Sequence, residues 1–586
     1  MRMPMYSYKT LLIKASLAYI VVLIVFIAFY TFFSYSGLPL GWDTPRYVWH
    51  MQYLADSPTK FIEDNGFYNI LYALCGAFIV KLGVNAMVVE ILLPHLLVYV
   101  FILQIIRGLI LIDGNSNFPT RFLLALGWFA VFRFGADLHA NLLGLILILE
   151  ALFNLIKYFR NQTMHSLVAS IFLFLLASFA HIETTIYFII LCILGITISN
   201  GLKSAVKTGI FLAVAVTPAF LLYFYHLYEV AYNSGGFTAL SSPMPFWVWL
   251  AYIGPLGIFG FRGLYYATKS VKNPDFLYTI TIIWGCVSLL VPLIQYMFPS
   301  LFFVTFGERA LMLFPAPFLA QIAISKTQNS IPVVRIPKKI KTTTLVLVLS
   351  AAITIAYATY FTYRVFLPNS IYDKLIWIKE NYRGEKIILL VDDYDEFAGI
   401  KADLYNNWIK AIIDKDAYTY LGDSQYLTQN MSTPYFNTIS TQISNTFFNL
   451  INKKITCLQD LKILYVAELN VPAAPPNWFL TATKEVYNGI YEIDREILSQ
   501  NTERLLISFY KGKLVKGNFF LIEKNWSLSA SVLEFYDTNT QYGEYLLKFK
   551  LRDAGKYNMS LRYLANQRDR FSEDAPQIIS LKEREV

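Results

Sequence analysis

The chain has 586 residues, of which 56% are hydrophobic and 15% are charged, and its mean hydropathy is +0.46. Soluble globular proteins carry about 25% charged residues, so this composition argues against a soluble class and predicts a membrane protein. The net charge of +9 does not indicate a nucleic-acid-binding protein, because the Lys and Arg residues form short clusters between apolar runs. The four cysteines show neither metal-ligand spacing nor a disulfide framework.

About eleven apolar segments are long enough to predict membrane-spanning helices, which need roughly 20 residues each. They are residues 12–35, 86–107, 118–134, 138–158, 165–181, 184–200, 206–228, 245–265, 276–298, 304–325 and 342–364. The basic clusters between them, from Lys9 and Lys14 to the run at 335–341, all fall on one side. The positive-inside rule makes that side cytoplasmic. The sequence therefore predicts a multi-pass plasma-membrane protein with a cytoplasmic N-terminus.

One further apolar segment, residues 67–83, is predicted to lie in the outer interface and not to span. If it crossed the membrane, every later loop would change sides and the basic run at 335–341 would lie outside. A helix lying in the interface is physically allowed.

The chain changes character after about residue 365. Helical patterns at 373–382, 404–414 and 446–454 alternate with strand patterns at 386–393 and 461–468, which predicts an extracytoplasmic α/β domain over 366–470. Strands dominate 471–586 and predict a β-sandwich-like domain; they are residues 504–512, 518–524, 528–537, 543–553 and 555–565. The predicted fold is thus an all-α membrane domain over 1–365, with juxtamembrane helices, followed by two soluble domains.

Ionisable side chains gather at the predicted outer ends of several helices. They are Asp43 and Arg46 in the first outer loop, Asp137 and His139 in the next, and His181, Glu183, Glu308 and Arg309 farther along. Charged groups near the bilayer are costly and are usually kept for function, so we expect one site built between helices. A carboxylate there can take the proton of an acceptor hydroxyl, and cations can stabilise a departing phosphate. This chemistry suits sugar transfer from a polyprenyl phosphate.

Four stretches carry a resemblance to a known class of enzymes. They are GWDTPRYVW at 41–49, NILYALCGAFIVKLG at 69–83, RFGADLHANLLG at 133–144 and FGERALMLFPAPFLA at 306–320. Together they resemble the GT-C glycosyltransferases, which include protein mannosyltransferases and bacterial lipid A aminoarabinose transferases. The resemblance covers about residues 10–365, and soluble C-terminal domains are often appended in archaeal members. The WWDYG-type signature of oligosaccharyltransferases is absent from the C-terminal region, which argues against en bloc transfer to protein by that family.

The resemblance implies an inverting hexosyl- or pentosyltransferase that uses a polyprenyl-phosphate sugar and a glycan, lipid or protein acceptor. Asp43 matches the catalytic acidic residue and is expected to be the general base, while Asp137 matches the second acidic position. The residues expected to bind the substrate and its phosphate are Arg309, Glu308, His181, Glu183, His139 and Arg46. A divalent metal ion, Mg or Mn, on Asp43 and Asp137 stays an open alternative.

Structural and functional alternatives remain. Asp43 is also placed to cap the helix that begins near Pro45, and Asp137 has the helical ion-pair spacing to Arg133. A transporter or flippase for lipid-linked saccharides is the second candidate function, although transporters place charged groups near the bilayer midplane. A polysaccharide polymerase or ligase and a non-catalytic glycan-binding assembly protein are further candidates.

Overall fold

A computed structural model describes most of the first 382 residues and shorter stretches beyond them. The described residues are 8–65, 67, 69–113, 117–233, 246–269, 276–297, 309–329, 337–382, 386–391, 407–413, 418–421, 461–466, 483–493, 513–516, 519–527, 530–537 and 544–546. The chain divides into two compact units, Met1–Arg504 with Asn525–Ser529, and Leu505–Lys524 with Ala530–Val586.

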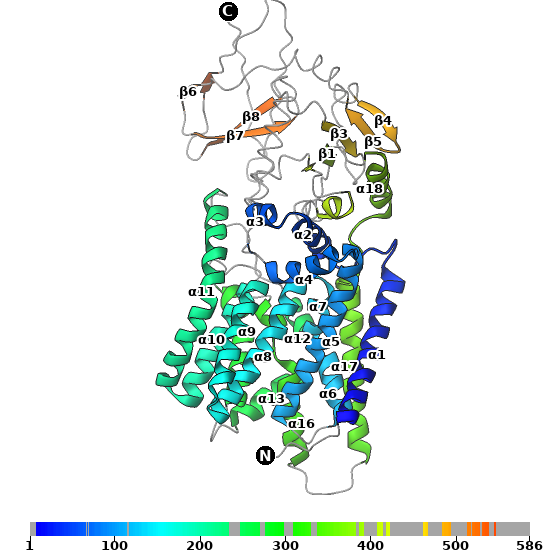
Figure 1. The fold of residues 1–586 in the computed structure, drawn as a ribbon. Helices are drawn as coiled ribbons and strands as arrows, with labels where there is room; N and C mark the ends of the chain where they lie inside the picture. Colours follow the sequence, from blue (N-terminus) through cyan, green and yellow to red (C-terminus); the bar gives the residue numbers. More distant parts are fainter. Residues whose placement is uncertain are drawn as a thin grey trace, which may run out of the picture. The chain divides into compact units, whose positions relative to one another are not determined.

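The first unit is mostly a bundle of apolar helices (Figure 1). Six of them are long and apolar enough to cross a membrane. They are α1 (Tyr8–Phe33), α5 (Ala86–Ile112), α8 (His139–Asn161), α10 (Ile182–Asn200), α11 (Leu202–Asn233) and α14 (Phe276–Met297). On α1, the apolar residues Leu17, Ile20, Ile24 and Ile27 follow helical spacing and are 48 to 60% exposed. An exposed apolar stripe of this kind suits contact with lipid, and the chain is a multi-pass membrane protein.

The predicted count of eleven spans is not confirmed, because several predicted spans are broken or short. The apolar run at 118–134 forms two helices, α6 (Phe118–Leu126) and α7 (Phe129–Ala136). The run at 245–265 likewise forms α12 (Phe246–Ile253) and α13 (Gly257–Lys269), separated at Gly254, whose φ is +66°. The remaining bundle helices are α9 (Met164–Ala180), α16 (Ala316–Asn329) and α17 (Pro337–Phe361). Hydropathy alone does not register such breaks.

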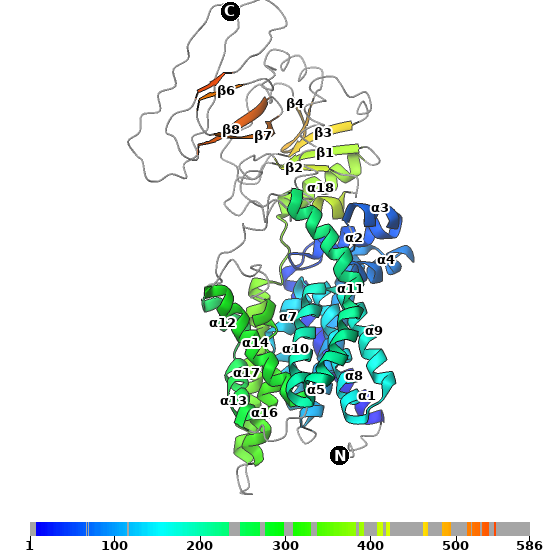
Figure 2. The same ribbon diagram turned by 90° about the vertical axis from the view of Figure 1, so that its left-hand side faces the viewer.

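Three short helices lie together at one end of the bundle (Figures 1 and 2). They are α2 (Thr44–Asp56), α3 (Pro58–Asn65) and α4 (Ile70–Lys81). Helix α4 has 12 residues, which corresponds to about 18 Å at 1.5 Å per residue. The hydrocarbon core of a bilayer is about 30 Å thick, so this length is consistent with the predicted interfacial position.

The predicted topology can be tested by cysteine labelling in a variant without the native cysteines. We expect a membrane-impermeant maleimide to label Gln500→Cys in intact cells and to label Arg335→Cys only after permeabilisation. The reason is the one-sided distribution of the basic clusters. The opposite labelling pattern would overturn both the topology and the outer location of the site.

A five-stranded mixed sheet follows the membrane helices. Its strand order is β2-β1-β3-β5-β4, with β1 parallel to β2 and β3, and β5 antiparallel to β3 and β4. The elements are α18 (Asn369–Asn381), β1 (Lys386–Val391), β2 (Tyr418–Leu421), β3 (Leu461–Val466), β4 (Thr483–Tyr487) and β5 (Ile490–Ile493). Predicted elements at 373–382, 386–393 and 461–468 coincide with α18, β1 and β3. The hairpin β4–β5 continues the sheet past residue 470, and the predicted helix at 446–454 lies outside the described residues.

Two two-stranded sheets lie beyond residue 512, mostly in the second unit, although Asn525–Ser529 belong to the first. Strand β6 (Lys513–Lys516) pairs with β9 (Glu544–Leu546), and β7 (Phe519–Ser527) is hydrogen-bonded to β8 (Ala530–Asp537). Three of these strands overlap the predicted strands at 518–524, 528–537 and 543–553. The predicted strands at 504–512 and 555–565 lie outside the described residues, and the β-sandwich is not confirmed.

A short helix at 407–413 packs against α2 within the first unit. The indole N–H of Trp49 donates a hydrogen bond to Asn407 Oδ1 at 2.8 Å, and the ammonium of Lys410 lies 4.5 Å from the Trp49 ring centroid. Trp408 is fully buried in a core that includes Leu38. Helix α2 is therefore held by the membrane domain and by the soluble sequence that follows it.

Candidate active site

Asp43 lies immediately before α2, at the N-cap position. Pro45 stands in the first turn of the helix, but the carboxylate of Asp43 makes no capping hydrogen bond. The turn is closed instead by Thr44, whose hydroxyl donates to the Gly41 carbonyl at 2.9 Å. Asp43 is half-buried. The pKa of Tyr47 is raised well above its usual value, first by the burial of Tyr47 and second by the negative charge of Asp43. Its side chain is thus not used for capping.

Gly41 brings the Asp43 turn against the turn that carries Asp137. Its φ is +120°, and a Cβ there would overlap the backbone carbonyl of Ala136 and lie 3.0 Å from the Cβ of Asp137. The Gly41 amide also donates to the Arg364 carbonyl at 3.0 Å. Only glycine combines this backbone conformation with so close an approach. Two acidic residues far apart in the sequence therefore belong to neighbouring turns.

Asp137 is buried beside two groups that stabilise its charge. It forms an ion pair with Arg133 and accepts a hydrogen bond from the backbone amide of Trp42. Burial raises the pKa of Asp137, and Arg133 opposes that rise. The i,i+4 ion pair is present, but it is a buried pair at the end of α7 and not a surface pair.

Arg46 lies in the first turn of α2, one residue before Tyr47, and is half-buried. Its charge acts on His50, whose pKa is lowered well below the usual value, mainly by burial. Arg46 is therefore on the same helix as Asp43, within one turn of it.

His139 points into the protein. It is 1% exposed, its Nδ1 lies 2.7 Å from Glu90 Oε1, and its Nε2 lies 3.1 Å from the Gly135 carbonyl oxygen. The substrate-binding role predicted for His139 has no direct geometric support in this arrangement. Glu90 was not among the predicted residues, although a lone carboxylate in the apolar run at 86–107 is the kind of signal that marks a functional or paired group.

His181, Glu183 and Arg309 meet at the start of α10. Arg309, in a helical turn at 309–312, forms an ion pair with Glu183, and its Nη1 lies 3.2 Å from His181 Nε2. The other ring nitrogen of His181 lies 2.9 Å from Thr184 Oγ1. The first turn of α10 thereby fixes the imidazole, which in turn helps to orient the guanidinium. Glu308 lies outside the described residues.

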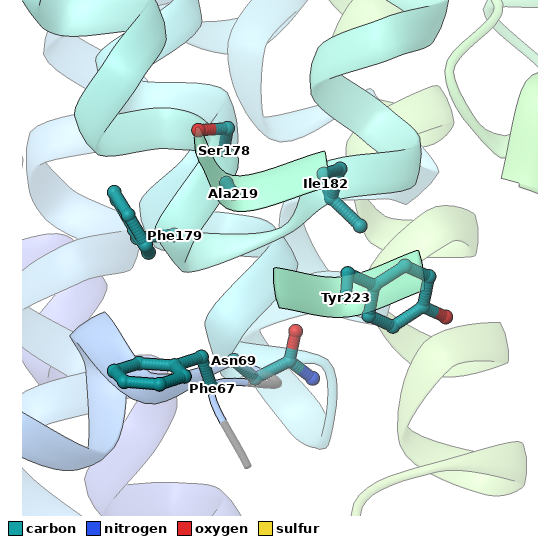
Figure 3. Close-up of a pocket in the computed structure, with 7 residues that line it drawn as sticks. All are labelled: Phe67, Asn69, Ser178, Phe179, Ile182, Ala219 and Tyr223. Carbon is teal, nitrogen blue, oxygen red and sulfur yellow. The ribbon is translucent and has the colours of Figure 1, made fainter. Parts of the chain in front are cut away.

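Figure 3 shows a small pocket at the start of α10. Its lining comes from the turn before α4 and from α9, α10 and α11, and consists of Phe67, Asn69, Ser178, Phe179, Ile182, Ala219 and Tyr223. The Tyr223 hydroxyl lies 3.5 Å from Glu183 Oε1. The pocket is therefore lined by both apolar and polar groups and has a charged neighbour on one side.

Helix α8 connects the two groups of side chains. Gly144, five residues after His139, faces His181, and a Cβ on Gly144 would lie 3.4 Å from the His181 Cβ. Five residues correspond to about 7.5 Å along a helix. The Asp43–Asp137 turns and the Arg309 cluster are thus both close to the first two turns of α8.

A divalent cation would find two carboxylates here. Within the described residues there is no group of three His, Cys, Asp or Glu side chains that could hold a metal ion. Mg²⁺ is commonly bound by one or two carboxylates together with substrate phosphate oxygens. Asp43 and Asp137 would be the two carboxylate ligands of such an ion, and Asp137 is already paired with Arg133.

Two solved structures are similar to this chain over most of its length. No protein-family model and no curated protein matches the sequence. The chain is similar to the structure of the archaeal oligosaccharyltransferase AglB from Archaeoglobus fulgidus in complex with an inhibitory peptide and a dolichol-phosphate. The TM-score is 0.46 at 11% identity, over 90% of this chain and 74% of that chain. It is also similar to the mycobacterial arabinofuranosyltransferase AftD, with a TM-score of 0.44 at 14% identity, over 93% of this chain and 42% of that chain.

Proposed function

We propose that the protein is an inverting glycosyltransferase that transfers a sugar from a polyprenyl phosphate to an acceptor at the outer face of the membrane. The observation that carries the proposal is the close approach of the Gly41–Asp43 turn to Asp137 at the end of the helix bundle where α2, α3 and α4 gather. Such a position lets an acceptor approach from water while the lipid part of the donor stays in the bilayer.

The reaction needs a base and a stabilised leaving group. Asp43 takes the proton of the acceptor hydroxyl, and the oxygen attacks the anomeric carbon opposite the phosphate. The bond between that carbon and the phosphate oxygen breaks, and the electron pair leaves with the polyprenyl phosphate. One displacement inverts the anomeric configuration.

Asp43 suits the role of base better than Asp137. Asp137 is 4% exposed and is engaged by Arg133 and the Trp42 amide. Asp43 is only half-buried, so an acceptor hydroxyl can reach it more easily. In the alternative with a metal ion, both carboxylates would be ligands and the ion would act as Lewis acid on the phosphate.

Proteoliposomes separate this proposal from the transporter and polymerase alternatives. Radiolabelled polyprenyl-phosphate mannose and polyprenyl-phosphate arabinose serve as donors, and an envelope extract of the host cell supplies acceptors. We expect single-sugar transfer with release of polyprenyl phosphate. Movement of the donor across the bilayer without transfer would support a flippase, and chain growth on one acceptor would support a polymerase.

Arg309→Ala is expected to raise the donor KM and to lower kcat. A guanidinium beside the phosphate acts on binding and on departure, and loss of one such donor costs on the order of 10²–10³-fold in kcat. Arg309→Lys should recover part of the loss, because the charge stays while the planar fork is lost. Initial rates at varied donor concentration measure both constants.

Arg262→Ala is the matched control. Arg262 lies on α13 and its guanidinium stacks on Tyr266, away from the residues of the candidate site. If Arg309→Ala and Arg262→Ala have the same donor KM and kcat, Arg309 does not bind the donor phosphate.

A further inference from the structure

A fully buried hydrogen-bonded unit lies next to the two carboxylate turns. It consists of Glu90 on α5, Tyr72 on α4 and His139 at the start of α8. Glu90 is 0% exposed, the Tyr72 hydroxyl donates to its Oε2 at 2.8 Å, and His139 Nδ1 lies 2.7 Å from its Oε1. We call these three residues the Glu90 unit.

The chemistry of the contacting groups determines which atoms donate and which accept hydrogen bonds in the Glu90 unit. The Gly135 carbonyl only accepts, so Nε2 of His139 carries a proton and donates to it at 3.1 Å. One further proton lies between Nδ1 and Oε1 of Glu90. Whether that proton is on nitrogen or on oxygen, a hydrogen bond forms. Each of these polar contacts is therefore satisfied within the protein.

Through Gly135, the Glu90 unit holds the turn that carries Asp137. Asp137 lies between Gly135 and His139, which are joined by the Nε2 hydrogen bond. Gly135 is also packed tightly against Val98 of α5, where a Cβ would overlap the Val98 side chain. Asp137 is thus on a short segment fixed at both ends to α5.

Through Tyr47, the Glu90 unit also contacts the helix that Asp43 begins. The Tyr47 ring centroid lies 5.3 Å from that of His139 and 4.9 Å from that of Tyr72. The Tyr47 backbone amide donates to the Asp43 carbonyl at 3.2 Å. The same buried unit therefore contacts elements that carry both carboxylates.

We propose that Glu90 and His139 are positioning residues that set the separation of Asp43 and Asp137 through the hydrogen bonds of the Glu90 unit. This inference rests on the proposed glycosyltransferase function of the two carboxylates. Glu90 and His139 are too buried to touch substrate, at 0% and 1% exposure, so they act through the Asp43 and Asp137 turns.

Two substitutions of Glu90 separate positioning from proton transfer. In Glu90→Gln, the amide oxygen can accept from Tyr72 and the amide nitrogen can donate to Nδ1 of a neutral imidazole. The Gly135 hydrogen bond is kept as well. Glu90→Leu removes the first two interactions and leaves Tyr72 and His139 with buried polar atoms that lack these partners.

We expect Glu90→Leu to lower kcat on the order of 10²-fold, since a displacement of about 1 Å at a reacting centre can cost that much. The donor KM should stay near the wild-type value, because the Arg309 cluster is not touched. Glu90→Gln should retain most of the wild-type kcat. Initial rates and thermal unfolding of the same purified samples provide the comparison.

Glu150→Leu is the matched control. Glu150 on α8 pairs with Arg107 on α5 and accepts from Gln104 Nε2 at 3.0 Å. It therefore joins the same two helices as the Glu90 unit, but roughly 16 Å farther along α8. We expect Glu150→Leu to lower the unfolding temperature while the folded protein keeps its kcat.

Two results would overturn the inference. One is an equal kcat for folded Glu90→Leu and Glu150→Leu, which would make Glu90 a stability residue only. The other is a Glu90→Gln variant as inactive as Glu90→Leu, which would assign a role to the carboxyl proton itself. If the wild type transfers no sugar, the proposed function fails separately. Structures of the variants then still test positioning, because the Asp137 turn must move relative to Gly41 in Glu90→Leu and stay in Glu150→Leu.

Discussion

Purified Asp43→Asn should transfer sugar on the order of 10²–10⁴-fold more slowly than the wild type, the usual loss for a general base. Asn keeps the size and hydrogen-bonding capacity of the side chain, but it cannot accept the proton of the acceptor hydroxyl. Folding should be unaffected, since Asn preserves the shape of the side chain and residue 43 is only half-buried. Single-turnover rates with saturating polyprenyl-phosphate sugar measure the chemical step directly.

Asp56→Asn is the control for this experiment, because Asp56 is exposed at the other end of the same helix. Near wild-type transfer by Asp43→Asn would show that the catalytic assignment is wrong. A second measurement is the activity of both proteins at increasing concentrations of Mn²⁺ or Mg²⁺. If activity needs the ion and Asp43→Asn weakens its binding, Asp43 is a ligand and the ion supplies the Lewis acid.

Gly41→Ala should lose activity and stability together. The residue has φ of +120°, outside the conformations that L-amino acids adopt with ease, and such backbone strain costs about 1–3 kcal/mol. The added Cβ would also overlap the Ala136 carbonyl. A backbone group cannot rotate away like a flexible side chain, so the Asp43 and Asp137 turns must separate. We expect a kcat loss on the order of 10²-fold for a shift of about 1 Å.

Gly37→Ala isolates the contribution of the close approach. Gly37 also has positive φ, at +70°, but nothing lies within 4 Å of a Cβ placed there. Both substitutions strain the backbone, and only Gly41→Ala pushes the two turns apart. Thermal unfolding and kcat should therefore change together in Gly41→Ala, while Gly37→Ala should change stability alone. An equal kcat in the two variants would contradict the proposed geometry.

Local patterns determined much of the fold in advance. The six spans such as α5 and α8 follow from apolar runs, because transfer of a helix into lipid depends on its own side chains. The strands β1 and β3 likewise follow from short runs of branched apolar residues. The GT-C resemblance depends on motifs within single stretches, such as GWD at 41–43 and ADLH at 136–139. These features need no knowledge of distant contacts.

The helix breaks and the strand pairings could be recognised only in the tertiary structure. The run at 118–134 is apolar enough to predict one continuous span, so hydropathy does not reveal that the helix stops at Gly127 and resumes at Phe129. The pairing of β5 with β3 depends on a strand partner outside the predicted domain. Neither the helix break nor the strand pairing follows from the hydrophobic periodicity of the sequence.

The candidate site, too, could be predicted only in part from the sequence. Acidic and basic residues at helix ends were recognisable in the sequence, because charges beside apolar runs are expensive and therefore conspicuous. Their grouping was not, since the approach of Asp43 to Asp137 depends on the missing side chain of Gly41 against a carbonyl of another helix. The direction of His139 was likewise decided by Glu90, a partner on a different helix. Sequence thus determined which residues carry charge at the helix ends. Only tertiary packing decided which of them meet, because contacts between helices depend on shape complementarity across the whole bundle.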